Sequence, residues 1–412
     1  MSHEGTLPPE TARARLLQTV GKIVRTESCA LTAAAGRRLD AALVASANLP
    51  ATANAAVDGY AVHADFLAAN PTHAFTIVGR AAAGHPFSGR IAKGEAIRIF
   101  TGAIMPDGPD AVAMHEQCRA DETAGTVQID TALTPGSNSR PAGENIRVGE
   151  TIIAAGTRLG PADIGIAAAA GHATLSVCRR LVVGLVSMGD EIVEPGAVPA
   201  FGQSFDSNRP MLRALVAADG HEVRDFPIVP DDAEALIATY RKAFGSCDVV
   251  ISSGGASDGD EDHTQTALQA LGAELVFWRL AMKPGRPMAV GSLGWKRLFC
   301  LPGNPVAAFV CYRLLAAPAL TVMAGGEAGT ILRIPVRAGF THRKRVGRAE
   351  YLRVRLQADD AGQIVMQLHG RRGAGVLSSL TGADGLIEIP VENAGVSEGD
   401  YLSFIPFREA GL

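Results

Sequence analysis

The sequence predicts a multidomain α/β protein built around a doubly wound, mainly parallel α/β ligand-binding domain. The chain has 412 residues, whereas a single domain usually has ~100–200, so several domains are expected. Between residues 179 and 326, apolar runs of strand length alternate with amphipathic helical stretches, which is typical of a parallel sheet with helices on both faces. The flanking regions contain short β-type runs separated by glycine and proline turns, which predicts β-rich domains there.

The residues before 179 divide into two kinds of segment. Residues 8–45 show helical periodicity in PETARARLLQTV, and residues 142–178 contain a second helical stretch, PADIGIAAAAGHA. Between them, residues 46–141 contain strand-like runs such as AFTIVGRAAAG and EAIRIFTGAIMP. We therefore expect the two flanking segments to fold together as a discontinuous linker domain of mixed structure, around an inserted β-rich domain.

Residues 179–326 are predicted to form the ligand-binding domain, and residues 327–412 a C-terminal β barrel. The predicted strands of the ligand-binding domain are RLVVGLVSMG, HEVRDFPIV, CDVVISSGG, AELVFWRLAM, RPMAVGS and RLFCLPG. Its predicted helices lie near 208–218, 232–244, 263–271 and 305–317. The apolar run VAAFVCYRLLAAPALTVMA is interrupted by Arg313 and Pro318, so we interpret it as a buried helix and not as a membrane span.

The composition argues against several classes of function. The 38 basic and 42 acidic residues give a net charge of −4, too even a balance for the basic field that nucleic-acid binding generally needs. The six cysteines include no C-x-x-C pair, which fits reduced thiols in a cytoplasmic protein. The first 18 residues contain no apolar signal core, so secretion is not predicted. A Walker A motif and a G-x-G-x-x-G helix start are both missing, which disfavours P-loop NTPases and dinucleotide dehydrogenases.

The loops that follow the predicted strands are the candidate ligand site, because ligands of open α/β sheets bind at the carboxyl ends of the strands. These loops are SMGDE (187–191), VPDD (229–232), SSGGASDGDED (252–262), MKPGRP (282–287) and LPGNP (301–305). Gly254 and Gly255 offer N–H groups with little steric hindrance, and Lys283 and Arg286 add positive charge, a combination that suits a phosphate. Arg279 lies four residues before Lys283 on one predicted strand, so we expect both cations on the same face.

Acidic residues follow three of the same strands. They are Asp190, Glu191, Asp231, Asp232, Asp258, Asp260, Glu261 and Asp262. A Mg²⁺ ion held by one or two carboxylates and by substrate phosphates needs such oxygen ligands. Alternatively, the acids after residue 257 form a solvated loop before the next helix, and Asp231 begins a capping box with Glu234. LPGNP precedes a helix whose N-terminus is a second candidate anion position. The residues alone thus predict a phosphorylated, nucleotide-like ligand with Mg²⁺.

A series of motifs, in order along nearly the whole chain, resembles the MoeA family of molybdopterin molybdenumtransferases, which includes the E domain of gephyrin. The motifs are LPATANAAVDGYAV, IRIFTGAIMPDGPDAV, SMGDEI, DSNRPML, SSGGASDGDEDHT, KPGRP and LPGNPV, with GRAEYLRV and GAGVLSSLTGADGLIEIP in the tail. The resemblance implies insertion of molybdate into adenylylated molybdopterin, with Mg²⁺-dependent release of AMP. It also implies an elongated homodimer of four-domain subunits, with each active site between the α/β domain of one subunit and the β-rich domain of the other.

The resemblance assigns roles to individual residues. It makes Asp58, Thr101 and Glu191 the candidate catalytic residues, and Asp231 and Asp262 the candidate metal ligands. The candidate substrate-binding residues are Gly254, Gly255, Ser257, Arg279, Lys283, Arg286, Pro302, Asn304 and Pro305. The chain departs from the family pattern at Ala53 and Asn145, where aspartates occur, and at Arg279 and Arg286, where lysines occur. A guanidinium is a planar fork and an ammonium a point charge, so we expect an altered anion geometry.

Two other functions are compatible with parts of this pattern. A molybdopterin adenylyltransferase would have a related α/β domain, but it would not need the preceding residues with VDGY and FTGA. A non-catalytic scaffold, like the gephyrin E domain in receptor anchoring, would not need Asp58 or the acidic cluster. Molybdate and tungstate are both compatible with the sequence, because they are tetrahedral dianions of similar size. The expected partners are the adenylyltransferase and recipient molybdoenzymes, with neither nucleic acid nor a membrane involved.

Overall fold

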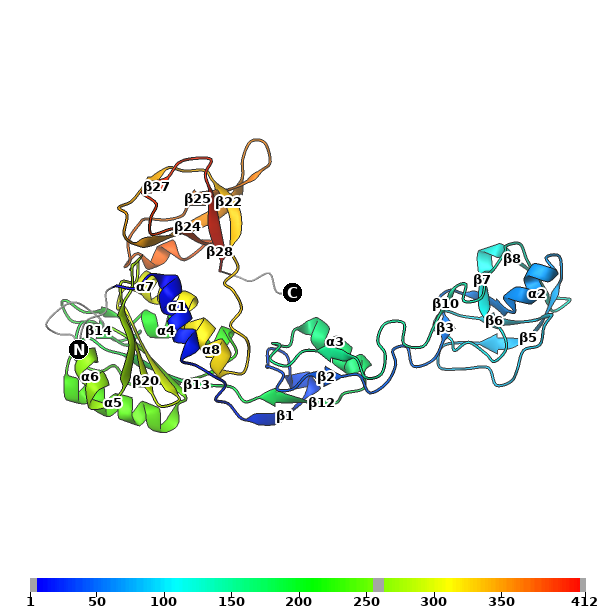
Figure 1. The fold of residues 1–412 in the computed structure, drawn as a ribbon, viewed down its shortest axis with the longest axis horizontal. Helices are drawn as coiled ribbons and strands as arrows, with labels where there is room; N and C mark the ends of the chain where they lie inside the picture. Colours follow the sequence, from blue (N-terminus) through cyan, green and yellow to red (C-terminus); the bar gives the residue numbers. More distant parts are fainter. Residues whose placement is uncertain (1–5, 255–262, 408–412) are drawn as a thin grey trace.

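The protein is elongated, with two units at one end, a thin linker and a separate β-rich unit at the far end (Figure 1). The structure is a computed structural model, and it describes residues 6–254 and 263–407. The α/β unit and the C-terminal barrel lie against each other, and the chain leaves the α/β unit once, after residue 18, and returns near residue 180 after building the arm. This arrangement determines which candidate residues can meet within one chain.

The β-rich unit at the far end is a six-stranded sheet with the strand order β7-β4-β6-β5-β9-β8. Its elements are β4 (Gly59–Val62), α2 (Ala64–Ala69), β5 (Phe75–Ala81), β6 (Glu95–Ile99), β7 (Ala111–Met114), η2 (His115–Gln117), β8 (Cys118–Asp121) and β9 (Thr126–Ile129), with the pair β3 (Asn54–Ala55) and β10 (Ser139–Arg140) beside it. Neighbouring residues of β4 enter different apolar clusters, Ala61 on one face and Tyr60 and Val62 on the other. Both faces are therefore packed.

The linker unit consists of two short strand pairs and a helix. It contains β1 (Thr26–Ala30), η1 (Leu31–Ala33), β2 (Leu43–Val44), β11 (Thr151–Ile153), α3 (Pro161–Ala169) and β12 (Thr174–Cys178). β1 pairs with β12 and β2 pairs with β11, so segments more than 100 residues apart build one small core. The first helix, α1 (Pro9–Gln18), was predicted in this unit but packs on the α/β unit, because Ala12 and Leu16 are fully buried in the α/β core.

The α/β unit has a six-stranded sheet with the strand order β16-β13-β17-β21-β20-β18. The strands are β13 (Val182–Ser187), β16 (Glu222–Asp225), β17 (Val249–Ser253), β18 (Glu274–Arg279), β20 (Pro287–Leu293) and β21 (Lys296–Leu301), and the small pair β14 (Ile192–Val193) and β15 (Ser204–Phe205) lies beside them. β16, β13, β17 and β21 are parallel, whereas β20 is antiparallel to both β21 and β18. Because of this double reversal, β18 runs in the same direction as β21, and the carboxyl ends of both strands lie at the same edge of the sheet.

Helices cover both faces of this sheet, which confirms the doubly wound α/β prediction. The helices are α4 (Asn208–Ala218), α5 (Ala233–Ser246), α6 (Thr264–Ala270), α7 (Pro305–Cys311), the π-helical η3 (Tyr312–Ala316) and α8 (Ala317–Met323). α5 and α6 pack on one face, and α1, α4, α7 and α8 pack on the other (Figure 1). In the described part of the chain, one helical run, Pro305–Met323, is long and apolar enough to span a membrane, and 67% of it is buried in the protein.

The C-terminal unit is a closed barrel, as predicted. Its strands are β22 (Ile334–Ala338), β24 (Ala349–Ala358), β25 (Ile364–Leu368), β26 (Gly385–Ile389) and β28 (Tyr401–Pro406), and the pairing of β24 with β26 closes the ring. The pair β23 (His342–Arg343) and β27 (Gly395–Val396) and the turn η4 (Leu377–Ser379) lie outside the ring. Tyr351 and Ile405 of the barrel belong to the same buried cluster as α7 and α8, so the barrel is packed firmly on the α/β unit.

Candidate active site

The loops at the carboxyl edge of the α/β sheet are joined by backbone hydrogen bonds. The Met188 amide donates to Ser253 O at 3.1 Å, and the Gly189 amide donates to Val229 O at 3.1 Å. The Gly254 amide donates to Leu301 O at 3.3 Å. The loops after β13, β16, β17 and β21 therefore form one continuous surface, as the parallel topology requires.

Gly254 lies at the centre of this surface, where the backbone has no space for a side chain. Its φ of 91° is in the left-handed region, and a Cβ there would lie 2.4 Å from Met188 O. Gly303 in the last loop lies beside it, and the Asn208 side chain donates to Gly303 O at 2.6 Å. The predicted substrate-binding residues Gly255 and Ser257 and the predicted metal ligand Asp262 lie outside the described residues.

Two acids from different loops face each other at this edge. The Asp190 amide donates to Asp231 Oδ2 and the Asp231 amide donates to Asp190 Oδ1, both at 3.3 Å. The capping interpretation of Asp231 is wrong, because the N-cap of α5 is Asp232, whose side chain accepts from the Ala235 amide at 2.7 Å. Asp231 is therefore not needed for helix capping. Within residues 6–254 and 263–407, no group of three or more His, Cys, Asp or Glu side chains could hold a metal ion.

Glu191 lies next to this pair and is exposed. Its carboxylate folds back over Gly189, since a Cβ at residue 189 would lie 2.1 Å from Glu191 Oε2. Its carbonyl accepts from the Ser204 amide of β15 at 2.7 Å, which fixes the loop. The side chain is thus at the rim of the edge surface, within the same loop as Asp190.

Arg279 and Lys283 lie on two different strands, so the prediction that they share a strand face is wrong. β18 ends at Arg279, and Lys283 belongs to β19 (Met282–Lys283), which pairs with β24 of the barrel. Arg279 ends β18 at the carboxyl edge of the α/β sheet. Lys283 follows four residues later, after the chain has crossed from the α/β sheet to the sheet of the barrel. Arg286, in the same connection, is exposed.

Lys283 pairs with a buried carboxylate of the barrel. Its Nζ lies 2.8 Å from Glu350 Oε1, and His342 Nε2 lies 2.9 Å from Glu350 Oε2. Burial raises the pKa of Glu350, but the hydrogen bonds and charges of Lys283 and His342 outweigh burial and lower it below its usual value. The carboxylate is therefore ionised and holds Lys283 in place.

A pocket between β19 and the barrel extends from this pair, and its lining includes five basic residues. The basic residues in the lining are Lys283, His342, Arg343, Arg353 and Arg372. The Arg353 guanidinium is held by Ser379 Oγ at 2.9 Å and by Arg371 O at 3.1 Å. No role was predicted from the sequence for Glu350, Arg353 or Arg372, although the motif GRAEYLRV contains the first two. Such a pocket is suited to an anion.

The N-terminus of α7 is not open for an anion in the way that was predicted. The helix begins at Pro305 with Asn304 as N-cap, and Pro302 before it is buried. The Val306 amide, the first N–H that the helix could offer, donates to Ala374 O at 3.0 Å. The barrel therefore occupies this helix end.

Asp58 and Thr101 form the second half of the candidate site, in the β-rich unit. Asp58 Oδ1 accepts from the Thr101 amide at 2.8 Å and from Thr101 Oγ1 at 2.7 Å. The backbone hydrogen bond and then the hydroxyl lower the pKa of Asp58, so this exposed carboxylate is ionised. Gly59 begins β4 and allows its close approach to β7, because a Cβ there would lie 1.8 Å from Ala113 O.

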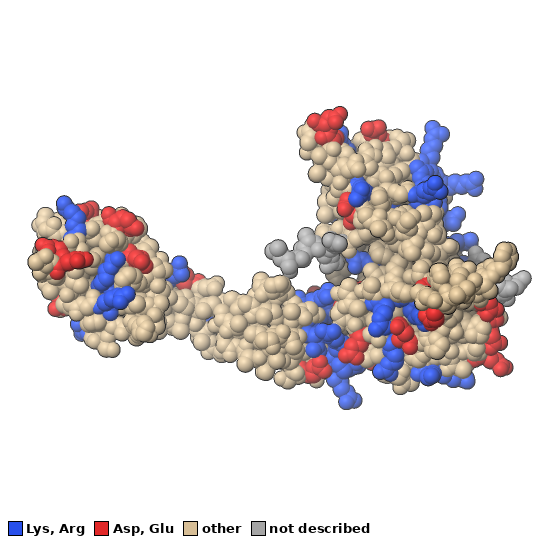
Figure 2. Space-filling model, turned by 180° about the vertical axis from the view of Figure 1, so that it is seen from behind, with Lys and Arg blue, Asp and Glu red and all other residues tan. Residues whose placement is uncertain are grey.

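The structure separates these two halves within one chain. Asp58 directly precedes β4 at the far end of the arm, whereas Asp190, Asp231 and Lys283 lie on the α/β unit at the other end (Figure 1). Figure 2 shows basic and acidic side chains interspersed on the end units, and few charged side chains on the linker between them. No single-sign field covers this face.

Three models of known protein families match successive segments of the chain. Residues 7–171 match the MoeA N-terminal region (domain I and II), residues 184–322 a probable molybdopterin binding domain, and residues 335–407 the MoeA C-terminal region (domain IV). The chain is also 33% identical to a molybdopterin molybdenumtransferase of Haemophilus influenzae, over 97% of this chain and 98% of that protein. The chain belongs to the MoeA family. The resemblance seen in the sequence is thereby confirmed.

Other relatives agree with this assignment. A molybdopterin molybdenumtransferase of a Nostoc species is 33% identical over 91% of this chain and 87% of that protein. The crystal structure of a molybdopterin biosynthesis MoeA protein from Pyrococcus horikoshii OT3 matches with a TM-score of 0.84 at 26% identity, covering 98% of this chain and 100% of that one. This MoeA-family member is therefore an enzyme of the molybdenumtransferase kind, with a role in molybdenum cofactor biosynthesis.

Proposed function

We propose that this MoeA-family enzyme inserts molybdate into adenylylated molybdopterin and releases AMP. The observation that carries the proposal is the carboxyl edge of the α/β sheet, which holds the Gly254 turn and the Asp190–Asp231 pair. The basic pocket beside Lys283 is joined to the last loop of this edge, because Ala374 of its lining accepts from the Val306 amide. A glycine turn admits a phosphate to close backbone contact, and cations offset its charge. A substrate with a phosphoanhydride and a second anion needs both features.

The Asp190–Asp231 pair fits a Mg²⁺ ion that is completed by substrate phosphates. Mg²⁺ usually takes one or two protein carboxylates, and waters and phosphate oxygens fill its other positions. Two facing carboxylates from separate loops meet that requirement, and neither is used as a helix cap. When bound, the ion would offset negative charge on the phosphates. We propose Asp231 and Asp262 as metal ligands, together with Asp190, which faces Asp231.

The basic pocket between β19 and the barrel is the proposed position of the oxyanion. Charged donors are offered there by Lys283, Arg353 and Arg372. The Glu350 carboxylate holds Lys283 in place through their ion pair. A tetrahedral dianion such as molybdate accepts hydrogen bonds from several such donors at once. Tungstate has the same charge and shape, so we expect it to compete. Arg279 and Arg286 lie on either side of Lys283 in the same connection and are assigned to the substrate phosphates.

We propose that a homodimer completes each site. Asp58 and Thr101 lie at the far end of the arm and cannot serve the α/β edge of their own chain in this conformation, so a second copy has to supply them. The linker face with few charged side chains is compatible with such a contact, since the cores of interfaces are depleted in charge. In the assembled site, the ionised Asp58 would be aimed at the reacting groups by Thr101, with Glu191 at the rim.

The cellular setting follows from the same assignment. All six cysteines are free thiols, which fits a reducing cytoplasm. The substrate would come from a molybdopterin adenylyltransferase, and the product would pass to molybdoenzymes, so these proteins are the proposed partners.

The test of the proposal is the choice of substrate. The purified protein is given either adenylylated molybdopterin with molybdate and Mg²⁺, or ATP with molybdopterin. We expect AMP release in the first mixture that depends on molybdate, and no adenylylation in the second. Adenylylation of molybdopterin would favour an adenylyltransferase instead, and inactivity in both mixtures with tight binding of another protein would favour a scaffold.

A further inference from the structure

Two arginines, Arg80 and Arg98, lie side by side on the sheet of the β-rich unit. Arg80 belongs to β5 and Arg98 to β6, the neighbouring strand (Figure 1). The two residues are direct cross-strand partners in the register of these parallel strands. Like charges on directly opposite residues repel each other and weaken a sheet. The fold therefore does not explain why both residues of this arginine pair are basic.

No carboxylate of the described chain forms an ion pair with either member of the arginine pair. The ion pairs within the β-rich unit lie elsewhere and are Lys93–Asp65 and Arg119–Asp130. Arg98 Nη1 donates to Gly59 O at 3.2 Å, and a carbonyl oxygen does not neutralise a guanidinium. Arg80 is exposed and Arg98 is half-buried. Two positive charges thus remain for a ligand.

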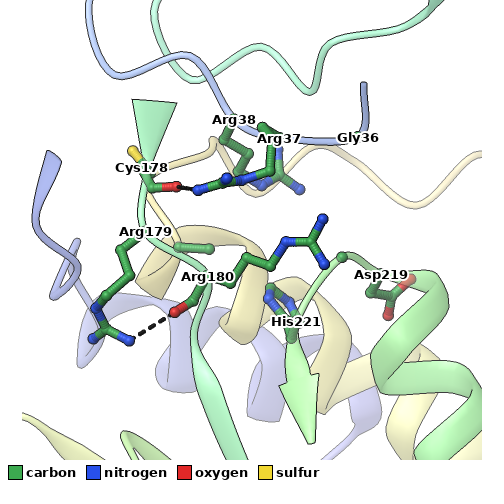
Figure 3. Close-up of a pocket in the computed structure, with 10 residues that line it drawn as sticks. Gly36, Arg37, Arg38, Cys178, Arg179, Arg180, Asp219 and His221 are labelled. Atoms are coloured by element: carbon green, nitrogen blue, oxygen red, sulfur yellow. Dashed lines mark hydrogen bonds between the residues drawn. The ribbon is translucent and has the colours of Figure 1, made fainter. Parts of the chain in front are cut away.

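Arginines at the junction of the linker unit and the α/β unit provide a contrast. Figure 3 shows them around a pocket that also contains the buried His221. Arg37 pairs with Glu27 and donates to Cys178 O at 2.9 Å. Arg179 makes a two-pronged contact with Asp248, with both N···O distances at 3.0 Å. Carboxylates of the chain account for these arginines, whereas they do not account for the pair on the β-rich unit.

Aromatic rings hold both guanidinium groups in position. The guanidinium carbons of Arg80 and Arg98 lie 4.6 and 5.0 Å from the centre of the Phe100 ring. The same carbon of Arg98 lies 4.9 Å from the centre of the Tyr60 ring. A guanidinium that stacks on a ring keeps N–H donors at its edge for a ligand. Phe100 directly precedes Thr101, so the arginine pair is held next to the partner of the candidate catalytic acid.

Arg98 also acts on Asp58 directly. It donates to the carbonyl of Gly59, the residue that follows Asp58. After the two hydrogen bonds from Thr101, the charges of Arg98 and His115 contribute to the lowered pKa of Asp58. An ionised Asp58 repels a phosphate, and nearby cations offset that repulsion. The arginine pair lies where this compensation is needed.

We propose that Arg80 and Arg98 form an anion subsite of the β-rich unit, which takes a phosphate group beside Asp58. Its part in the reaction rests on the proposed function, in which the phosphoanhydride of the substrate meets Asp58 of a second copy. In that assembly, Lys283 of one copy and the arginine pair of the other bind the same substrate. The β-rich unit thus contributes to substrate binding as well as to catalysis.

The test is a titration of the whole protein with inorganic phosphate at constant ionic strength, followed by the imidazole NMR signals of His115. The charge of His115 acts on Asp58, so its ring is a local probe, and His115→Gln assigns its signals. We expect saturable shifts in the wild type. Arg80→Gln should weaken phosphate binding about tenfold, since it removes a charge-assisted contact. Arg80→Lys keeps the charge and should weaken binding less.

Two control variants separate the subsite from other sources of the signal. Arg119→Gln removes an exposed arginine of the same unit, which is paired with Asp130. Lys283→Ala alters the basic pocket of the α/β unit. Both should keep the phosphate response of His115. A response that is absent from the wild type, or that is equally strong in Arg80→Gln, would overturn the proposal. Titration with AMP distinguishes a phosphate monoester from free phosphate, and binding of either supports the subsite.

A kinetic measurement distinguishes failure of the subsite from failure of the proposed function. A wild type that releases no AMP from adenylylated molybdopterin, but whose phosphate response depends on Arg80, would refute the function and support the subsite. Where AMP is released, Arg80→Gln should raise KM about tenfold and change kcat less, because the phosphate contact is already made in the bound substrate. An unchanged KM would overturn the assignment of this subsite to the substrate.

Discussion

Replacement of Lys283 by alanine should weaken substrate binding more than it lowers the stability of the fold. Lys283 Nζ lies 2.8 Å from Glu350 Oε1, and the Glu350 carboxylate is buried. A hydrogen bond with a charged partner contributes about 1.5–3 kcal/mol. However, the Lys283 side chain is 65% exposed, and solvent screening limits such a pair to about 1 kcal/mol. We therefore expect Lys283→Ala to lower the free energy of unfolding by about 1 kcal/mol.

The stability loss should depend on pH in a defined direction. Glu350 has a lowered pKa in the folded protein, so the unfolded chain binds its proton more readily. The stabilisation is present above the ordinary pKa of a glutamate and is lost as the pH falls through the lowered value. The difference in melting temperature between wild type and Lys283→Ala should therefore be visible at pH 7 and should disappear in acid.

Binding should suffer more, because the bound anion excludes water from Lys283. A charge-assisted contact of about 1.5–3 kcal/mol corresponds to a roughly 10- to 100-fold weaker Kd. The assay is equilibrium binding of adenylylated molybdopterin at low salt, in parallel with thermal unfolding. Lys93→Ala is the matched control, since Lys93 forms an exposed ion pair with Asp65 in the β-rich unit. Unchanged affinity of Lys283→Ala at low salt would refute the assignment of Lys283 to the ligand.

Two further substitutions test other parts of the account. Asp58→Asn keeps the oxygen that accepts both hydrogen bonds from Thr101 but removes the charge, so the variant should stay folded, bind substrate and release AMP slower by a factor of about 10². Near-normal, molybdate-dependent AMP release would contradict a chemical role. In the wild type, the pKa of His221 is lowered to about 4, so between pH 6.5 and about 4 the unfolded chain binds a proton that the folded chain does not bind, and the free energy of unfolding falls as the pH falls. His221→Gln should remove this part of the pH dependence of the melting temperature. An unchanged melting profile in that window would speak against the buried, neutral imidazole.

Local sequence patterns were sufficient to predict the α/β sheet and the loops at its carboxyl edge. Alternation of apolar runs and helices determines a doubly wound sheet, and the topology then brings the loops together. The N-cap of α5 is Asp232, one residue after the predicted Asp231. Two consecutive acids before a helix do not show which of them is the cap. The break between Arg279 and Lys283 could not be predicted locally, because β19 exists through its pairing with the distant β24.

The basic pocket was missed for the same reason. Glu350 reaches Lys283, and Arg353 joins the same pocket, through the packing of the barrel on the α/β unit, about 70 residues later in the chain. Contacts of such sequence separation carry no periodic signal, so they become visible in the folded chain alone.

The most direct test of the central claim, an active site shared between two copies, is complementation between two inactive variants. Asp58→Asn is altered at the far end of the arm, and Asp231→Asn at the α/β edge. Unfolding is avoided by exchanging subunits of the folded proteins, and AMP release from adenylylated molybdopterin with molybdate is then measured. Each variant alone should be nearly inactive, whereas an equal mixture should regain about one quarter of the wild-type activity, because half of the dimers are mixed and each has one intact site. A mixture that exchanges subunits but stays as inactive as its components would contradict the shared site.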